Sequence, residues 1–171
     1  AGSATAGTVW LYEDITARRA AEQALEQSHQ EQQLIFDNAL IGISYQRNRN
    51  ILRCNRRLEE IFGYAPGELA GQSTRRLFAS DNDWEETGRR VYAGANGDHQ
   101  TFDGEICYCK RNGTPIWVHV IGRTVNVAGG EVTWIWIYDD ITARRAAEES
   151  LARKAREYAL IFDNAMIGIA P

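Results

Sequence analysis

The chain has 171 residues, a formal net charge of −4 and a charged fraction of 25%. A chain of this length buries one sizeable core, and its acidic balance argues against nucleic acid or an anionic membrane surface as the main partner. No run of about 18 apolar residues occurs, so we expect no membrane segment.

The three cysteines, Cys54, Cys107 and Cys109, are too few and odd in number for a disulfide framework. Cys107 and Cys109 form a Cys-x-Cys pair in a strand-like stretch, but no second pair completes a zinc site. The N-terminus also lacks the basic and apolar regions of a signal peptide. These features predict a cytoplasmic protein without bound metal.

The first predicted elements are a β-run over Thr8–Glu13 and a helix over Ile15–Asn38, where Ala, Arg, Glu and Gln dominate. Asp14 or Thr16 is a suitable N-cap for this helix. Its apolar stripe is narrow and a/d-like, which favours a two-helix coiled coil over burial in a globular core. The predicted dimer contacts of this connector, residues 17–36, are Ala17, Ala21, Leu25, Ser28 and Ile35.

Short elements follow. Strands are predicted over Ile41–Gln46 and Asn50–Arg53, and Asn55 is placed as the N-cap of a helix over Arg56–Phe62 that stops at Gly63. The remaining elements of this part are helical turns over Pro66–Leu69 and Ser73–Leu77, and a longer helix over Asp83–Tyr92 with Asp81 or Asp83 at its start.

Three strands complete the central unit. Phe102–Lys110 and Thr114–Val127 flank Arg111-Asn112-Gly113, a hairpin turn in which Gly supplies a positive φ. Gly129-Gly130 then turns into Val132–Tyr138, and a second connector helix is expected over 143–161. The order ββααααβββ predicts an α+β fold, with an antiparallel sheet and helices grouped on one side.

An internal repeat frames this unit. The nonapeptide DITARRAAE starts at Asp14 and again at Asp140, and 22 of 34 positions are identical between Trp10–Ile43 and Trp136–Ile169. The separation of the two copies, from Asp14 to Asp140, is longer than a solenoid repeat and fits a domain plus its connector. We therefore expect tandem copies of one domain: residues 1–16 end one copy, residues 37–142 form a complete copy, and residues 162–171 begin another.

The central unit resembles the PAS sensor domain family, also called the sensory box. NRRLEEIFGYAPGELAGQS (Asn55–Ser73) is similar to the family's signature of small helices, and KRNGTPIWVHV (Lys110–Val120) to its Lys-x-x-Gly-x-x-x-Trp hairpin. Ile41-Gly42-Ile43 looks like the first strand, and Asp140-Ile141-Thr142 matches the terminal Asp-Ile-Thr motif. The resemblance implies a five-stranded antiparallel sheet cupped around a pocket, flanked by helices that pair across a dimer and pass signals to an output domain.

Within this resemblance the Asp-Ile-Thr segments connect a last strand to a departing helix. The Asp would bond locally and the Thr hydroxyl would cap the helix, so that strand movement becomes helix tilt, rotation or register shift. The alternative is that these residues simply join strand to helix. The predicted signal-relay residues are Asp14, Ile15, Thr16, Asp140, Ile141 and Thr142.

The resemblance also defines a candidate pocket. Strand alternation sorts the side chains into two faces, and the resemblance implies that Cys107, Cys109, Trp117 and His119 lie on the outer one. There an apolar patch around Trp117 would be covered by the preceding helix or a second subunit. Aromatic rings from the last strand favour a small or collapsed pocket, and they fit plain core equally well. The candidate pocket residues are Ile43, Tyr45, Ile61, Phe62, Ile106, Tyr108, Val118, Val120, Trp134, Trp136 and Tyr138.

Cofactors of the family can be tested against these residues. Flavin-binding blue-light members carry a Cys in a Gly-x-Asn-Cys-Arg-type motif, whereas the matching stretch, Gly71–Arg75, reads GQSTR. Haem-binding members use an axial His on the long helix, but Asp83–Tyr92 has none; His99 follows it and His119 lies in a strand. We expect neither flavin nor haem, and leave a small-molecule ligand open.

No catalytic triad, phosphate-binding Gly loop or metal cluster stands out, so no enzyme activity is expected in this chain. The favoured function is a sensory module, homodimeric through its connector helices and open sheet face. It would signal through neighbouring PAS copies to an output domain, either a diguanylate cyclase (GGDEF) or phosphodiesterase of cyclic-di-GMP signalling or a histidine kinase. The alternative is a passive dimerisation spacer that binds no ligand.

Overall fold

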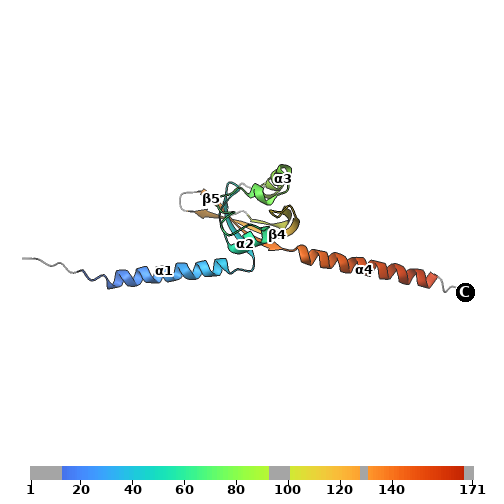
Figure 1. Cartoon of the computed structure of the whole chain (residues 1–171), viewed down its shortest axis with the longest axis horizontal. Coiled ribbons are helices and arrows are strands. Elements are labelled where there is room, and N and C mark those ends of the chain that lie inside the picture. Colours follow the sequence, from blue (N-terminus) through green and yellow to red (C-terminus); the bar gives the residue numbers. More distant parts are fainter. Residues whose placement is uncertain (1–12, 93–100, 128–130, 168–171) are drawn as a thin grey trace, which may run out of the picture. The chain divides into compact units, whose positions relative to one another are not determined.

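The computed structural model describes residues 13–92, 101–127 and 131–167 (Figure 1). The chain divides into two compact units, one ending at Phe36 and the other beginning at Asp37. Most of the β-run predicted over Thr8–Glu13 and the predicted Gly129-Gly130 turn lie outside the described residues.

One antiparallel sheet organises the second unit. Its strand order is β2-β1-β5-β4-β3, so the last strand in sequence, β5, lies between β1 and β4. The predicted α+β fold with a five-stranded antiparallel sheet is therefore confirmed. The strands are β1 (Gly42–Arg47), β2 (Asn50–Cys54), β3 (Thr101–Cys109), β4 (Pro115–Val127) and β5 (Glu131–Asp140).

Three short helical elements cover the inner face of this sheet: α2 (Arg56–Phe62), the 3-10 helix η1 (Thr74–Leu77) and α3 (Asp81–Tyr92) (Figure 1). Their apolar side chains and those of the inner strand faces form one buried cluster. Phe62 lies at its centre, with its ring edge-on to Tyr108 and Tyr138 at centroid distances of 5.4 and 6.0 Å. Burial of these residues is the main stabilising contribution to the fold.

Asn55 joins α2 to the first strand. As predicted, its side chain accepts a hydrogen bond from Leu58 N and caps α2. The same fully buried side chain accepts from Ile43 N at 2.8 Å and donates to Ile41 O at 2.9 Å. One residue therefore fixes both the start of the helix and the start of β1.

The segment after α2 is a turn, and the helical turn predicted over Pro66–Leu69 is wrong. Glu68 N donates to Ala65 O, and Gly67 has φ +84°, which is the geometry of a type II turn with Pro at its second position. The buried carboxylate of Glu59 accepts from Gly67 N at 2.9 Å and from Leu69 N at 3.2 Å. These bonds satisfy backbone donors that a helix would have used.

Helix α3 begins at Asp81, one of the two starts predicted for it, and ends at Tyr92 as predicted. Ser80 precedes it and acts as the cap, because its hydroxyl accepts from Asp83 N at 3.1 Å and donates to the Asp83 carboxylate at 2.7 Å. Acidic residues in the first turn and Arg89 and Arg90 in the last turn suit the helix dipole.

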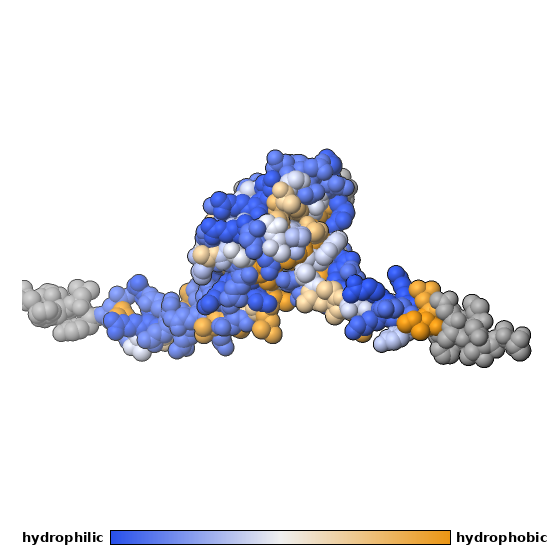
Figure 2. All heavy atoms as spheres, turned by 45° about the vertical axis from the view of Figure 1, so that its right-hand side comes forward, coloured by the Kyte–Doolittle hydropathy of each residue, from blue (hydrophilic) through white to orange (hydrophobic). Residues whose placement is uncertain are grey.

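The two connector helices are α1 (Thr16–Asp37) and α4 (Thr142–Ile167), so α4 continues beyond the predicted connector end at 161. No residue of α1 is buried. Figure 2 shows apolar side chains interrupting the hydrophilic surface of the helices. Neither described helix is long and apolar enough to cross a membrane. Among the side chains that the structure describes, the exposed large apolar residues on these helices are Leu25, Leu34, Ile35, Leu151, Tyr158, Leu160 and Ile161.

The role of Asn55 gives a stability prediction. Asn55→Ala removes the cap and two buried hydrogen bonds, and we expect it to lower the free energy of unfolding by about 3 kcal/mol. Urea denaturation measures this change. Ser73→Ala is the matched control, because Ser73 caps η1 through one bond, to Arg75 N, and should cost about 1 kcal/mol or less. Equal losses in the two variants would contradict the dual role of Asn55.

Candidate functional site

The junction between β5 and α4 is hydrogen-bonded to the neighbouring strand β4. Ile141 N donates to Trp117 O at 2.9 Å, Trp117 N donates to Thr142 Oγ1 at 3.0 Å, and the Thr142 hydroxyl reaches Trp117 O at 3.4 Å. Ile141 is only 2% exposed. The first turn of α4 is thereby attached to the sheet through the backbone of a single residue, Trp117.

The capping group at this junction is the Asp, and the predicted capping by the Thr142 hydroxyl is wrong. Asp140 Oδ1 accepts from Thr142 N at 3.0 Å, which leaves the Thr142 hydroxyl for β4. The first copy of the nonapeptide folds in the same way, with Asp14 Oδ1 accepting from Thr16 N at 2.9 Å. Hydrogen bonds from the side chain and backbone of Thr16 hold the pKa of Asp14 below its ordinary value.

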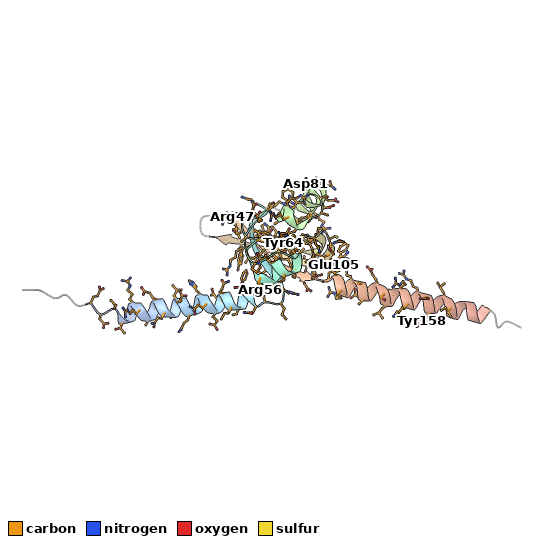
Figure 3. The ribbon with its side chains drawn as sticks, viewed as in Figure 1. Arg47, Arg56, Tyr64, Asp81, Glu105 and Tyr158 are labelled. Atoms are coloured by element: carbon orange, nitrogen blue, oxygen red, sulfur yellow. The ribbon has the colours of Figure 1, made fainter. Side chains whose placement is uncertain are left out.

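A second contact fixes the side of α4 that faces the sheet. The Arg145 guanidinium lies over the indole of Trp117, with its central carbon 4.0 Å from the ring centroid, and its Nη1 is 3.0 Å from Glu105 Oε2. Glu105 comes from β3 and lies next to the start of α4 (Figure 3). Both cation–π and charge–charge attraction therefore oppose rotation of the first turn.

A small cavity lies between the inner face of the sheet and the elements η1 and α3. Its volume is about 40 Å³, measured as the space that the centre of a water-sized molecule can occupy. Strands β1, β3 and β5 form one wall, and the helical elements form the other. The lining residues are Gln46, Arg49, Thr74, Leu77, Phe78, Thr87, Gly88, Val91, Tyr92, Ile106, Tyr108, Trp136 and Tyr138.

The polar groups of the cavity belong mainly to buried side chains. Gln46 Nε2 donates to Ser44 Oγ at 2.8 Å and to the Tyr138 hydroxyl at 2.6 Å. Burial raises the pKa of Tyr138 and of Tyr108 above the ordinary value, so both phenols stay neutral at physiological pH. Among the described residues, Trp136 Nε1 has no hydrogen-bond partner.

Arg49 closes one side of the cavity from an unusual backbone position. It follows Asn48 in the two-residue turn between β1 and β2, and both residues have positive φ, +49° and +62°. Its guanidinium stacks on Trp84 at 3.4 Å from the ring centroid, donates to Trp84 O and lies 3.6 Å from Glu85. Desolvation lowers its pKa from the ordinary value.

This close approach of Arg49 depends on Gly88. A Cβ at position 88 would lie 2.7 Å from the Arg49 guanidinium carbon. Arg49 has a left-handed backbone conformation and Gly88 is a glycine inside a helix, and each of these costs conformational free energy. The contact joins the β1–β2 turn to α3 over the cavity.

Comparison with known families identifies the domain. A family model described as "PAS domain" matches residues 38–143, which is most of the chain and all five strands. The chain belongs to the PAS domain family. The matched span agrees with the resemblance drawn from Asn55–Ser73 and Lys110–Val120.

Individual PAS relatives place the domain among signalling proteins. Over 119 residues the chain is 34% identical to the sensor protein TdiS of Thauera aromatica, covering 70% of this chain and only 22% of that protein. The PAS domain of a LuxR-family transcriptional regulator from Burkholderia thailandensis, solved in complex with ethanol, is 28% identical with a TM-score of 0.55, covering 63% of this chain and 95% of that one. The PAS domain of an HTR-like protein from Haloarcula marismortui is 25% identical with a TM-score of 0.60, covering 72% and 100%.

The structure brings four residues of the predicted pocket to the cavity of this PAS domain. Ile106, Tyr108, Trp136 and Tyr138 line the cavity. The other buried members of the predicted set belong to the core without lining the cavity: Ile61, Phe62, Val118, Val120 and Trp134.

Two predicted pocket residues, Ile43 and Tyr45, lie on the opposite face of β1. The register pairs them with Ile137 and Ile135, whereas Ser44 pairs with inward-facing Trp136. The prediction assigned the apolar residues of β1 to the core, but this strand turns its polar residues inward. The sequence analysis missed Gln46 and Arg49. The signals that could have found them are a Gln within a predicted strand and an Arg within the tight turn that follows it.

The residues predicted for the outer face of the sheet differ in exposure. Trp117, Cys107 and His119 are at least partly exposed, and His119 Nε2 is 2.7 Å from Asp103. Cys109 is buried, although it lines the same surface hollow as Cys107 and Trp117. The hairpin that follows Cys109 is held to α2 by a bond from Arg111 N to Phe62 O.

The residues of this PAS domain do not fit the larger cofactors of the family. A cavity of about 40 Å³ is far below the roughly 300 Å³ of a pocket for a drug-sized ligand, so a flavin ring system would have to displace core residues. Desolvation raises the pKa of Cys54 to about 12, which leaves it a neutral thiol. No metal-binding group of three or more His, Cys, Asp or Glu occurs in the described part of the chain, and His99 lies outside it.

The repeated nonapeptide supplies a matched test of the junction. Thr142→Val removes the hydroxyl bonded to Trp117, and we expect it to lower the free energy of unfolding by about 1–2 kcal/mol and to speed amide exchange in the first turn of α4. Thr16→Val changes the same residue in the same nine-residue sequence, where the structure places a bond to Asp14. It should cost less than about 0.5 kcal/mol, and a comparable cost would argue against the special role of the β4 contact.

Proposed function

We propose that the chain is a sensory and dimerisation module that relays the state of its cavity through α4 to an output domain elsewhere in the parent protein. The observation that carries this proposal is the attachment of α4 to β4 by Ile141 and Thr142. A helix bonded to the sheet must move when the sheet moves. The signal-relay residues are then Asp140, Ile141 and Thr142, with Asp14, Ile15 and Thr16 in the same role for a preceding copy.

A small ligand is the proposed input. The cavity is closed to large cofactors, and the 28% identical PAS domain from Burkholderia thailandensis was solved with ethanol, a molecule of suitable size. A ligand shifts such a domain only by binding one conformation more tightly than the other. The presence of a cavity in this core supports sensing over simple packing.

The output is proposed from the parent protein's relatives. Because the chain spans only 22% of the Thauera sensor protein, we place an output domain beyond this chain, and a histidine kinase is one proposed output. A diguanylate cyclase or phosphodiesterase is the other proposed output, and both classes act as dimers. Tandem PAS copies in the parent are favoured by the 22 identities between the two ends of the chain.

The alternative function is a passive dimerisation spacer. The stacked indoles of Trp134 and Trp136, 5.1 Å apart with an interplanar angle of 18°, fill much of the inner space and are compatible with a domain that binds nothing. In this alternative the chain still forms a dimer, but it transmits no signal from the cavity to α4.

The dimer is tested through α1. Sedimentation should show a dimer for the wild-type chain, and Leu25→Asp with Ile35→Asp should raise its dissociation constant by at least tenfold, because charge replaces exposed apolar residues of the predicted stripe. Gln23→Asp with Gln27→Asp is the control on another side of the helix and should leave the dimer intact. A monomeric wild-type chain would count decisively against the proposal.

The relay is tested by coupling the cavity to α4. The three native cysteines are replaced by alanine, and Tyr158→Cys carries a spin label (Figure 3). The label reports the distance between the paired α4 helices. Val91→Phe fills the cavity from α3 and should shift this distance distribution, whereas Ala70→Phe, on an exposed loop, should not. An unchanged distribution with Val91→Phe would favour the passive spacer.

A further inference from the structure

The unpartnered N–H of Trp136 carries an inference about what the cavity binds. Trp136 is 4% exposed and lines the cavity, and its Nε1 has no hydrogen-bond partner among the described residues. A buried donor left without an acceptor destabilises a fold, so native proteins supply a water or a ligand to such a group. The indole N–H is a donor only, so the missing partner is an acceptor.

The size of the cavity limits the occupant. A single water needs about 10–15 Å³ of such volume, and the cavity offers about 40 Å³. The space therefore suits about three waters or one organic molecule of about three or four non-hydrogen atoms. Most of the wall that such a molecule would contact is apolar, from Leu77, Phe78, Val91 and Ile106.

The charges around the cavity favour an uncharged occupant. Arg49 is a cation in the wall, and its guanidinium already bonds to Trp84 O and lies beside the Glu85 carboxylate. Both N–H groups of the Gln46 amide are used by Ser44 and Tyr138. A carboxylate entering the cavity would lose its hydration without gaining a free cation in exchange.

We propose that the cavity binds an uncharged alcohol or ketone of about three or four non-hydrogen atoms, whose oxygen accepts a hydrogen bond from Trp136 Nε1–H. The assignment rests on the proposed function in taking this cavity as the sensory input, and it adds the class of ligand and the residue that recognises it. The apolar wall holds the hydrocarbon part, and Trp136 orients the oxygen.

The test follows the indole N–H signals of the ¹⁵N-labelled full chain by NMR. 2-Propanol, acetone and sodium acetate are matched in size and differ in charge and donor capacity. The affinity limit per atom keeps such ligands at a dissociation constant on the order of 0.1 mM or weaker, so titration must reach the millimolar range. We expect a saturable shift of the Trp136 signal with 2-propanol and acetone, while the signal of outward-facing Trp117 stays unchanged.

Two results would overturn the proposal. The absence of a saturable shift with both uncharged probes would mean that water alone satisfies Trp136. A saturable shift with acetate alone would mean that the cavity selects an anion.

Two variants separate recognition from folding. Trp136→Phe removes the N–H, which identifies the signal and should weaken 2-propanol binding at least tenfold, read from a second cavity resonance. Because this core change also affects stability, Val91→Phe fills the space from the half-buried face of α3 and keeps the Trp136 reporter. Thermal melting confirms that each variant is folded; unaltered 2-propanol binding in folded Val91→Phe would place the ligand elsewhere.

The outcomes also separate this proposal from the proposed function. If 2-propanol binds at Trp136 and the distance between α4 helices does not respond, the ligand assignment stands and the relay fails. If neither uncharged probe binds and Val91→Phe still shifts the helices, the relay stands and the ligand assignment is wrong.

Discussion

The structure depends on one short set of hydrogen bonds, those between the backbone of Trp117 in β4 and the residues Ile141 and Thr142 at the end of β5. Without them, α4 would follow the strand through a single covalent connection and its direction would be free. With them, the helix start is bound to two adjacent strands, and the Arg145 contact with Trp117 and Glu105 limits its rotation. The same Trp117 therefore sets both the position and the orientation of the helix, through its backbone and its ring.

The fold and the order of its elements were readable from the sequence because local signals agreed with one another. Asn55 before an apolar-periodic run predicted the start of α2, and Arg111-Asn112-Gly113 between two strand-like runs predicted the hairpin. Identical nonapeptides formed the same Asp-capped helix start, because the capping bond spans only two residues. Caps and turns, which depend on residues close together in the sequence, were therefore predictable.

The site was less predictable because it depends on which face of β1 turns inward. The apolar pair Ile43 and Tyr45 suggested one parity, yet the register with β5 sets the other. A shift of one residue exchanges every side chain between the faces of a strand, so this single choice removed two residues from the predicted pocket and hid Gln46. Arg49 was hidden for a related reason: its left-handed backbone and its fit against Gly88 arise from tertiary contacts.

Strand β5 links the cavity to the junction. Trp136 and Tyr138 line the cavity, and Asp140 ends the same strand about 7 Å beyond Tyr138 at the rise of a strand. Because β5 is hydrogen-bonded on both sides, by β1 and β4, a change in the packing of Tyr138 cannot be relieved at a free edge. In the relay proposed above, a displacement along or across β5 reaches Asp140 and Thr142, where the strand ends and α4 begins. The central position of the last strand is the topological feature that supports this proposal.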